Sequence, residues 1–245
     1  RRPEQPRGAA MLTHLFWARG PLSQLERLCI GSFVRQGYAT QLWTYGGLDN
    51  APAGAVLRDA RDVLPESALF LNRRGSYAGF SDLFRYTVLH RHGGLYSDTD
   101  VVALQPPAAL PVGPFVVTER QPREQIQVNG NLLGNPVPRD GNLVDLARVY
   151  AERFPKDEIR WSEIGPSLLT GIVNMHPQHG FAILPPEFAN PIAWWDCPGS
   201  LLAATALAAD AAFVHLYNET WRRAGVDKNA PYPAGSLMAR LAALA

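Results

Sequence analysis

Two aspartates separated by one residue follow a short apolar segment near the middle of the chain. Asp98 and Asp100 come directly after Leu95-Tyr96-Ser97, which is predicted to be a strand. Successive side chains of a strand point to opposite faces, so this spacing predicts that both carboxylates project from one side. Carboxylate oxygens are the ligands that Mn²⁺ and Mg²⁺ prefer. The pair therefore predicts a divalent-cation site of the kind that neutralises a departing diphosphate.

The surroundings of this acidic pair exclude two other functions. A calcium loop that begins at Asp98 requires glycine at its sixth position and glutamate at its twelfth, where Ala103 and Ala109 stand. A phosphatase with an aspartate nucleophile requires a buried apolar strand before the first aspartate and acidic clusters after it. Here Gly93-Gly94 precedes the strand, and no Asp-Asp pair follows. A solvated turn is the remaining alternative.

The residues before the strand predict a helix that ends at the glycine pair. Ser81 is predicted to cap this helix, and Gly93-Gly94 to stop it. Asp82 and Arg85 share one face, and an ion pair on the helix surface is the alternative to a functional role for the two residues. Four apolar residues then recur at helical spacing: Leu83, Tyr86, Val88 and Leu89.

The first part of the chain predicts a strand, a helix and a second strand in that order. Residues 11–17 read as a buried strand, Ser23 as the cap of the next helix, and residues 38–45 as an alternating strand. This order is typical of a parallel βαβ unit, in which ligands bind at the carboxyl ends of the strands. Further strands are predicted at 115–118, 131–134 and 211–214, and helices at 143–154, 166–175 and after a proline-rich loop that begins at 229.

Length and composition agree with one large α/β domain. The chain has 245 residues, of which 47% are hydrophobic and 18% charged, as is typical of a globular protein. We expect residues 11–245 to form this domain, with a mainly parallel central sheet flanked by helices, and residues 1–10 to form a loose leader. The net charge of +1 predicts no general attraction to nucleic acid.

The cysteines and the apolar segments of the chain indicate where in the cell the protein is expected. Cys29 and Cys197 are far apart and form no metal or redox motif, which suits a reducing compartment. The longest apolar run, residues 201–214, is too short to span a bilayer and contains Asp210. The chain begins at Arg1, so an upstream anchor or leader remains compatible with the sequence. We therefore expect a cytoplasmic protein, with association at the inner face of a membrane as an option.

The motif residues as a set resemble the signature of glycosyltransferases that carry a DXD sugar-binding region. The residues are Ser81-Asp82-Leu83-Phe84-Arg85-Tyr86 and Gly93-Gly94-Leu95-Tyr96-Ser97-Asp98-Thr99-Asp100. That group includes the initiating α-1,6-mannosyltransferase, α-1,4-galactosyltransferases, bacterial capsule and lipopolysaccharide enzymes and, remotely, the clostridial glucosylating toxins. The resemblance implies a GT-A fold, a nucleotide-sugar donor, Mn²⁺ or Mg²⁺, and retention of anomeric configuration.

The resemblance also implies roles for residues that bind the donor. Asp82 and Arg85 would contact its sugar and phosphate, and Tyr96 would lie against the nucleotide. Trp17 ends the first predicted strand, where a base would lie in an open α/β sheet. Stacking on an indole is worth roughly 1–3 kcal/mol per base. The alternative is that Trp17 belongs to the core. However, Trp17-Ala18-Arg19-Gly20 is similar to the family's Trp-x-Gly turn, with one extra residue between Trp and Gly. Because of Trp17, we favour a UDP-sugar over a GDP-sugar as the donor.

A late segment supplies further candidates. His215 is expected to complete the metal shell begun by Asp98 and Asp100, because imidazole suits Mn²⁺ better than Mg²⁺. A hydrogen-bonded structural histidine is the alternative interpretation. Asn218 and Trp221 are candidates for contacts to the diphosphate, and the same segment recurs in the family as His-Leu-x-Asn-x-x-Trp. Lys228 lies in a loop that is expected to close over the donor.

Three other features complete the predicted site. Asn129 corresponds to an asparagine that lies near the transferred sugar in relatives. Gly165-Pro166 resembles the family's Gly-Pro helix start, and we interpret it as architecture. Glu119 and Asn129 are conceivable nucleophiles, but neither is a strong candidate. We therefore favour a same-face reaction in which the leaving phosphate accepts the proton of the acceptor hydroxyl.

The sequence thus predicts a metal-dependent retaining transferase that moves a hexose from a nucleoside-diphosphate sugar to a hydroxyl acceptor. The composition, rich in Ala, Arg and Pro, favours a bacterial source and a glycan acceptor in surface-polysaccharide synthesis. Two alternatives remain: an effector or toxin-type transferase with a protein acceptor, and a non-catalytic module that binds nucleotide sugars. The intact pair, Asp98 and Asp100, argues against the module.

Overall fold

A seven-stranded sheet forms the centre of the computed structural model, which describes residues 11–156 and 158–244. The predicted leader at residues 1–10 lies outside the described residues. The strand order is β3-β2-β1-β4-β7-β6-β8. The strands are β1 (Leu12–Phe16), β2 (Ala39–Thr44), β3 (Val56–Asp59), β4 (Gly94–Ser97), β6 (Phe115–Gln121), β7 (Gln125–Asn135) and β8 (Ala182–Leu184).

Most neighbouring strands of this sheet are parallel. β3, β2, β1 and β4 pair in parallel, as do β6 and β8, whereas β7 pairs antiparallel with β4 and β6. The predicted βαβ unit of β1, α1 and β2 is present with its parallel register. The predicted α/β class with a mainly parallel central sheet is therefore confirmed.

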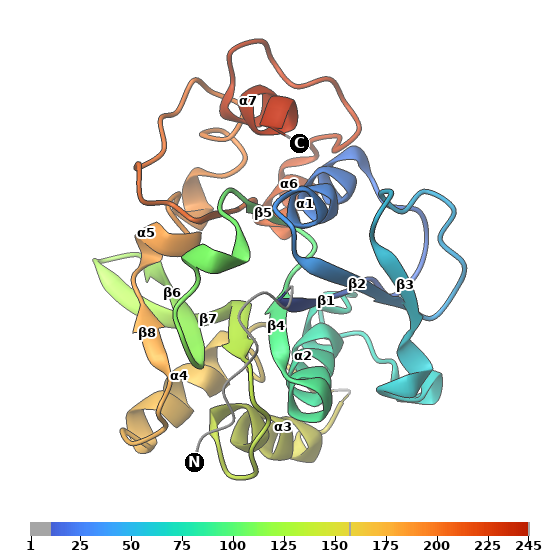
Figure 1. The fold of residues 1–245 in the computed structure, drawn as a ribbon, viewed down its shortest axis with the longest axis vertical. Coiled ribbons are helices and arrows are strands. Elements are labelled where there is room, and N and C mark those ends of the chain that lie inside the picture. The colour runs from blue at the N-terminus through green and yellow to red at the C-terminus, as the bar shows by residue number, and fades with distance from the viewer. Residues whose placement is uncertain (1–10, 157, 245) are drawn as a thin grey trace.

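Helices cover both faces of the sheet. α2 and α3 lie on one face and α1 on the other (Figure 1). The helices are α1 (Gln24–Arg35), α2 (Ala78–His92), α3 (Leu143–Arg153), α4 (Pro166–Met175), α5 (Pro186–Ala189), α6 (Asn218–Ala224) and α7 (Leu237–Leu244), with short 3₁₀ turns at Ala60–Asp62, Glu66–Ala68, Pro107–Ala109 and Trp194–Asp196. Two buried apolar clusters pack helices against the sheet, and a third lies between α1, α6 and α7.

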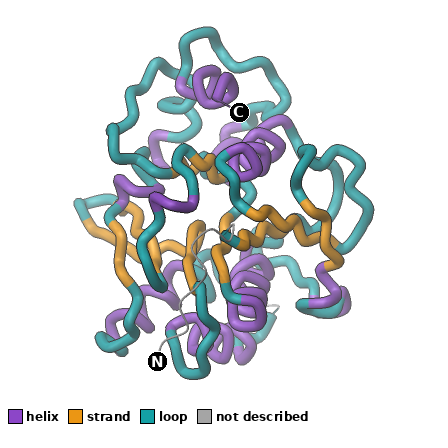
Figure 2. Tube along the Cα trace, in the orientation of Figure 1, coloured by secondary structure: helices purple, strands orange, loops and turns teal. Residues whose placement is uncertain are grey.

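A second, two-stranded sheet lies beside the carboxyl end of β4 (Figure 2). It pairs β5 (Val101–Ala103) with β9 (Phe213–His215) in antiparallel register, with Val101 opposite His215. The chain leaves the central sheet at Ser97 and enters β5 at Val101. Asp98-Thr99-Asp100 is therefore the turn that connects the two sheets.

The two aspartates lie in this turn and not on a strand, in contrast to the prediction. Asp98 and Asp100 were predicted to share a face because they continue a strand, but β4 ends at Ser97. The backbone N–H of Asp98 still donates to the carbonyl of Asn131 at 2.8 Å, which holds the first aspartate at the edge of the sheet. The two carboxylates converge because of the turn, and strand alternation is not the reason.

The start of α2 also differs from the prediction. The helix begins at Ala78 with Tyr77 as its N-cap, so Ser81 lies inside its first turns and does not cap it. The extra residues bring Phe80 into a cluster of buried aromatic rings with Phe16 and Phe84. Burial of a phenylalanine contributes more than the capping preference of a serine. The Ser81 hydroxyl instead forms a 2.9 Å hydrogen bond with the phenol of Tyr96 on β4.

The strands β6 and β7 are longer than predicted. The ends of both strands contain polar residues such as Glu119, Arg120 and Gln127, so apolar spacing does not predict them as strand. The connection between them places Arg123 and Glu124 in left-handed conformations, with φ of 65° and 60°, as a tight hairpin requires. The hairpin carries Glu119 and Asn129 side by side toward the second sheet.

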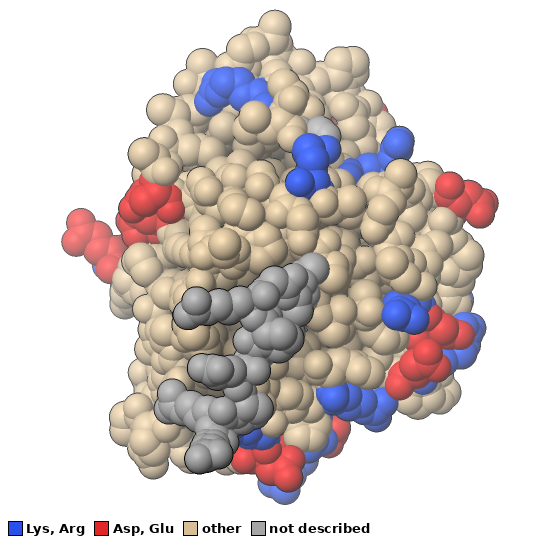
Figure 3. All heavy atoms as spheres, in the orientation of Figure 1, with Lys and Arg blue, Asp and Glu red and all other residues tan. Residues whose placement is uncertain are grey.

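The remaining predicted elements are close to those observed. α1 carries the predicted cap, where the Ser23 N–H donates to the Glu26 carboxylate at 2.8 Å. α3, α4 and the terminal helix α7 are present. Within the described ranges, no helix has both the length and the apolar character to cross a membrane. On the face shown in Figure 3, charged residues of both signs lie mostly toward the edges, in agreement with the small net charge.

Candidate functional site

A cleft of about 970 Å³ opens where the carboxyl ends of β1 and β4 meet the second sheet. Its walls come from the start of α2, from the hairpin of β6 and β7, and from the segment that follows β9. Parallel strands β1 and β4 deliver Trp17 and Asp98 to the same edge, as the crevice rule predicts. This cleft is the candidate active site.

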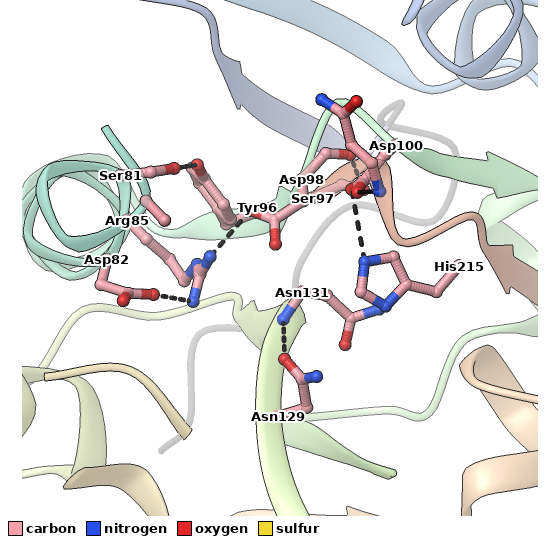
Figure 4. A network of polar contacts seen from close by, with 12 residues as sticks. Ser81, Asp82, Arg85, Tyr96, Ser97, Asp98, Asp100, Asn129, Asn131 and His215 are labelled. Carbon is pink, nitrogen blue, oxygen red and sulfur yellow. Dashed lines mark hydrogen bonds and ion pairs between the residues drawn. The ribbon is translucent and has the colours of Figure 1, made fainter. Parts of the chain in front are cut away.

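Three potential metal ligands lie together in the cleft. One ligand atom each from Asp98, Asp100 and His215 lies within 4.8 Å of the others. Nε2 of His215 is 3.4 Å from Oδ1 of Asp100 (Figure 4). The register of β5 with β9 brings about this meeting, because it places His215 opposite Val101, the residue after Asp100. The predicted grouping of the three side chains is therefore present in the structure.

A buried asparagine orients the imidazole of His215. Nδ2 of Asn190 donates to the carbonyl of Thr118 at 2.8 Å, so Oδ1 of Asn190 faces Nδ1 of His215 at 3.1 Å. An amide oxygen only accepts, so Nδ1 of His215 carries the proton that it donates. Burial opposes a charge on the ring, but Asp100 raises the pKa of His215 and favours a second proton on Nε2. In the neutral ring, Nε2 would face the aspartates with its lone pair free for a metal.

The second aspartate is held in its ionised form. The backbone N–H of Asn218 donates to Oδ2 of Asp100 at 2.7 Å at the start of α6. Burial alone would raise the pKa of Asp100, but His215 and this N–H outweigh it and lower the pKa below its ordinary value. Tyr217 adopts a left-handed conformation, with φ of 52°, to turn the chain from β9 into α6. Asn218 thus acts on Asp100 through its backbone, and its side chain faces the cleft.

Arg85 bridges two carboxylates beneath the cleft. Its Nη1 donates to Asp82 and its Nη2 to Asp98, each at 2.7 Å (Figure 4). The guanidinium also lies over the ring of Tyr96, with Cζ 4.9 Å from the centroid. The Arg85 side chain is only 4% exposed, so this ion pair is buried and does not lie on the helix surface. It connects α2 rigidly to the acidic turn.

Asp82 and Asp98 share the single guanidinium of Arg85, and the pKa of each carboxylate is raised. Burial raises the pKa of Asp82 to about 7, although Arg85 opposes the shift. Burial also raises the pKa of Asp98, again against the effect of Arg85. Because Asp82 and Asp98 share one guanidinium, a further cation beside Asp98 would favour its ionised form.

Two glycines allow this ion pair to form. A Cβ added to Gly130 would lie 2.2 Å from Nη1 of Arg85, and one added to Gly165 would lie 2.5 Å from Oδ2 of Asp82. Any side chain at either position would displace the pair. Gly165 was interpreted as architecture from the sequence, and the structure adds this close approach to Asp82 as its reason.

Trp17 lies at the cleft and is partly exposed. Its Nε1 donates to the carbonyl of Gly20 at 2.8 Å, which holds the indole against its own turn. Nζ of Lys228 is 5.8 Å from the ring centroid and also pairs with the fully buried Glu26. The loop that contains Lys228 is therefore tied to α1 next to Trp17.

Two predicted donor contacts are corrected by burial. Tyr96 is fully buried beneath Arg85 and does not line the cleft, so it positions Arg85 and Ser81 and offers no surface to a nucleotide. Trp221 is also buried, and its Nε1 donates to the carbonyl of Leu216 at 2.9 Å. Tyr96 thus packs beneath Arg85, and Trp221 holds the segment that follows His215.

Glu119 and Asn129 face the cleft from the hairpin. The Glu119 carboxylate accepts from Nε2 of Gln121 at 3.1 Å and of Gln127 at 3.4 Å. Burial raises the pKa of Glu119, although His215 opposes the shift. Oδ1 of Asn129 accepts from the backbone N–H of Asn131 at 2.9 Å (Figure 4). Glu119 is thus a carboxylate of the cleft in addition to Asp98 and Asp100.

Asn190 is the functional residue that the sequence analysis missed. It lies just after α5, and its contacts join three separate segments through Thr118, Asn131 and His215. An isolated asparagine near a proline carries no local signal that distinguishes it from a turn residue. Only its burial, at 1% exposure, marks it as a structural amide.

Comparison with known proteins agrees with this geometry. Residues 57–116, which contain α2, β4 and the acidic turn, match the family model described as "glycosyltransferase sugar-binding region containing DXD motif". Comparison with curated protein sequences gave no match. The segment that the sequence analysis singled out therefore matches the DXD sugar-binding region of glycosyltransferases, and it lies on a mainly parallel α/β sheet.

Several solved glycosyltransferase structures resemble this chain in part, each with a TM-score below 0.5. The PaToxG glycosyltransferase is 17% identical with a TM-score of 0.47, over 69% of this chain and 70% of its own. Mouse xyloside xylosyltransferase 1 is 15% identical with a TM-score of 0.47, over 86% and 99%. An active-site mutant of LgtC is 12% identical with a TM-score of 0.43, over 83% and 86%.

Proposed function

We propose that this chain is a retaining, metal-dependent transferase that moves a hexose from a nucleoside-diphosphate sugar to a hydroxyl acceptor. The observation that carries the proposal is the convergence of Asp98, Asp100 and His215 within one cleft. Two carboxylates and one imidazole suit Mn²⁺, and Mg²⁺ is the second choice. The fit is supported by Asn190, which leaves Nε2 of His215 facing the aspartates, and by the sharing of one guanidinium between Asp82 and Asp98.

Each residue of the cleft has a part in this proposal. The ion held by Asp98, Asp100 and His215 would neutralise charge on the diphosphate leaving group. Arg85 and Asp82 would orient the phosphate and the sugar from beneath. Trp17 would stack on the base, for which we favour UDP over GDP. Asn129 and Asn218 would offer amide groups to the donor.

The stereochemical course depends on whether Glu119 can act as a nucleophile toward the donor sugar. Glu119 is in the cleft but is held among amide side chains, and we retain the same-face route as the proposed mechanism. In that route, the bond from the anomeric carbon to the phosphate oxygen breaks as the acceptor oxygen attacks from the same face. The leaving phosphate then takes the acceptor's proton. Removal of Glu119 should therefore impair the reaction less than removal of Asp98 or Asp100.

The wider setting is also a proposal. We infer that residues 11–245 act as one domain, that the acceptor is a glycan in bacterial surface-polysaccharide synthesis, and that the reaction takes place in the cytoplasm or at the inner face of the membrane. The alternatives are a toxin-type transferase with a protein acceptor and a non-catalytic module. Turnover of the donor distinguishes the module from an enzyme, and the nature of the acceptor distinguishes the other two.

The first test is thermal stability of the purified chain with Mn²⁺ and a panel of UDP- and GDP-sugars. A donor at about a hundred times its Kd should raise the midpoint by about 5–10 °C. The rise should need both the metal and one nucleotide sugar. It should vanish in Asp100→Ala, whereas no rise with any member of the panel would contradict the proposal.

A second acidic group provides a matched control. His90, Asp140 and Asp145 also bring ligand atoms within 4.8 Å of one another, and none of the three lines the cleft. Arg148 donates to Asp145 at 2.7 Å, so this group already has its own cation. Asp140→Asn should leave the donor-dependent rise unchanged, which would assign the metal effect to the cleft.

A further inference from the structure

Two loops at one end of the cleft present an indole and a guanidinium together. Trp161 is 38% exposed and lines the cleft. Cζ of Arg74 lies 5.0 Å from the centroid of its ring, also at the cleft. We call this pair the Trp161–Arg74 platform. An indole exposed in a cleft offers a large flat apolar surface to a ligand, with its N–H free for a polar contact.

The loop that carries Arg74 is organised by a buried side chain. Oδ1 of Asn72 accepts from the N–H of Arg74 at 3.0 Å and from that of Ser76 at 3.2 Å. Asn72 is 6% exposed, so these bonds are shielded from water. The N–H of Arg73 donates to the carbonyl of Ile159 at 3.5 Å and ties this loop to the one that carries Trp161.

The loop that carries Trp161 is equally well tied. Glu163 accepts from the N–H of Arg160 at 2.8 Å and from its Nη2 at 3.0 Å. Ser162 adopts a left-handed conformation, with φ of 66°, which is strained for a residue with a side chain. The N–H of Ser167 donates to the carbonyl of Ser162 at 3.1 Å. The platform is thus held in place before any ligand binds.

The platform lies on the side of the cleft away from the metal ligands. From Asp98, the contacts run through Arg85 to Asp82, and Gly165 packs against Asp82. Trp161 precedes Gly165 in the same loop. The Asp82–Arg85 pair therefore lies between the metal ligands and the platform. A group bound on the platform would therefore be separated from the proposed metal ligands by the Asp82–Arg85 pair.

We propose that the Trp161–Arg74 platform binds an anionic sugar residue of the acceptor glycan, an inference that rests on the proposed function. The indole would cover the apolar face of a sugar ring. The guanidinium would bind a carboxylate, sulfate or phosphate of that sugar in a bidentate manner. Among the described residues, Arg74 forms no ion pair with a carboxylate, whereas Arg160 beside it is paired with Glu163.

Saccharide binding in the absence of donor tests the platform by itself. The probes are two matched pairs, trigalacturonate with maltotriose and 3′-sialyllactose with lactose, measured by calorimetry or saturation-transfer NMR. The wild type should bind the acidic member of at least one pair about tenfold more tightly than the neutral member. Trp161→Ala should weaken binding of the acidic sugar about tenfold, and Arg74→Gln should remove the preference for acidic sugars.

Trp195→Ala is the matched control, because Trp195 is 44% exposed but does not line the cleft. It should bind every probe as the wild type does. Equal binding of acidic and neutral sugars by the wild type, no binding of either, or no effect of Trp161→Ala would overturn the proposal.

The donor measurements separate this inference from the proposed function. In Trp161→Ala and Arg74→Gln, the rise in midpoint with Mn²⁺ and the nucleotide sugar should be unchanged. A reduced rise in Trp161→Ala would assign the indole to the donor and overturn the platform's role. If the wild type binds acidic sugars but shows no rise with any donor, the proposed function fails and the platform stands as a sugar site.

Discussion

The side-chain oxygen of Asn190 accepts a hydrogen bond from Nδ1 of His215 at 3.1 Å, and this contact determines which ring nitrogen faces the acidic turn. The amide is oriented by the carbonyl of Thr118, which accepts from its Nδ2. An asparagine outside the proposed metal-ligand set thereby fixes Nε2 of His215 as the nitrogen that would face a metal.

Replacement of Asn190 should weaken metal binding. We expect Asn190→Ala to lower the affinity for Mn²⁺ about 10–100-fold, because the imidazole loses the partner that sets its tautomer and orientation. Loss of the buried amide should also lower the free energy of unfolding by about 1–3 kcal/mol. Titration of Mn²⁺ followed by electron paramagnetic resonance measures the affinity.

Asn142→Ala is a control for the loss of stability alone. Asn142 caps α3, where its Oδ1 accepts from the N–H of Asp145 at 3.0 Å. Removal of this cap should destabilise the protein by about 1 kcal/mol without change in Mn²⁺ affinity. Equal Mn²⁺ affinities in the wild type and Asn190→Ala would refute the role of Asn190.

The glycines beside the buried ion pair should not tolerate a methyl group. Gly130→Ala is expected to push Arg85 away from Asp82 and Asp98, because its Cβ would lie 2.2 Å from Nη1 of Arg85. The free energy of unfolding should fall by about 3 kcal/mol or more, since buried carboxylates lose their partner. Denaturant unfolding measures this change, and transferase activity should fall with it.

Gly31→Ala is the matched control. Gly31 lies inside α1, and an added Cβ would meet only Pro52 at 3.9 Å. Alanine is favoured over glycine within a helix, so the variant should be more stable by about 0.5–1 kcal/mol. If both variants behaved alike, the close approach at Gly130 would not matter.

The elevated pKa of Asp82 should make stability depend on pH. Burial raises this pKa from 3.8 to about 7, against the opposing effect of Arg85. Between these values the folded state holds a proton that the unfolded state has lost, so this group's contribution to the free energy of unfolding decreases as pH rises from about 4 to about 7. Asp82→Asn removes the titrating group, and its unfolding free energy should vary less over this range in chemical denaturation. A steeper dependence in the variant would contradict the shift.

The pair formed by Lys228 and Glu26 should support the loop beside Trp17. Glu26 is fully buried, so Lys228→Met leaves its carboxylate without a cation and should destabilise the protein by about 1–3 kcal/mol. Lys228→Met combined with Glu26→Gln should be less destabilised than the sum of the single variants. Denaturant unfolding of the four proteins measures the coupling, and strictly additive effects would mean that the pair does not interact.

Much of the fold could be predicted because its signals are local. Apolar spacing and caps located β1, α1, β2, α3 and α4 closely, and the glycine pair marked the end of α2. The predicted bounds were wrong where side-chain packing determines how far a helix or strand extends. The aromatic cluster around Phe80 extended α2 beyond the predicted cap at Ser81, and polar strand ends hid the hairpin that carries Glu119.

The sequence by itself determined the acidic pair Asp98 and Asp100, the helix that carries Asp82 and Arg85, and the class of chemistry that these groups support. Their types and spacing are local properties of the chain. Only the tertiary structure decided that Arg85 is buried between two carboxylates, that Tyr96 and Trp221 lie behind the site, and that Asn190 orients His215. These relationships join residues far apart in sequence, and they depend on strand register and on close packing, which no local pattern encodes.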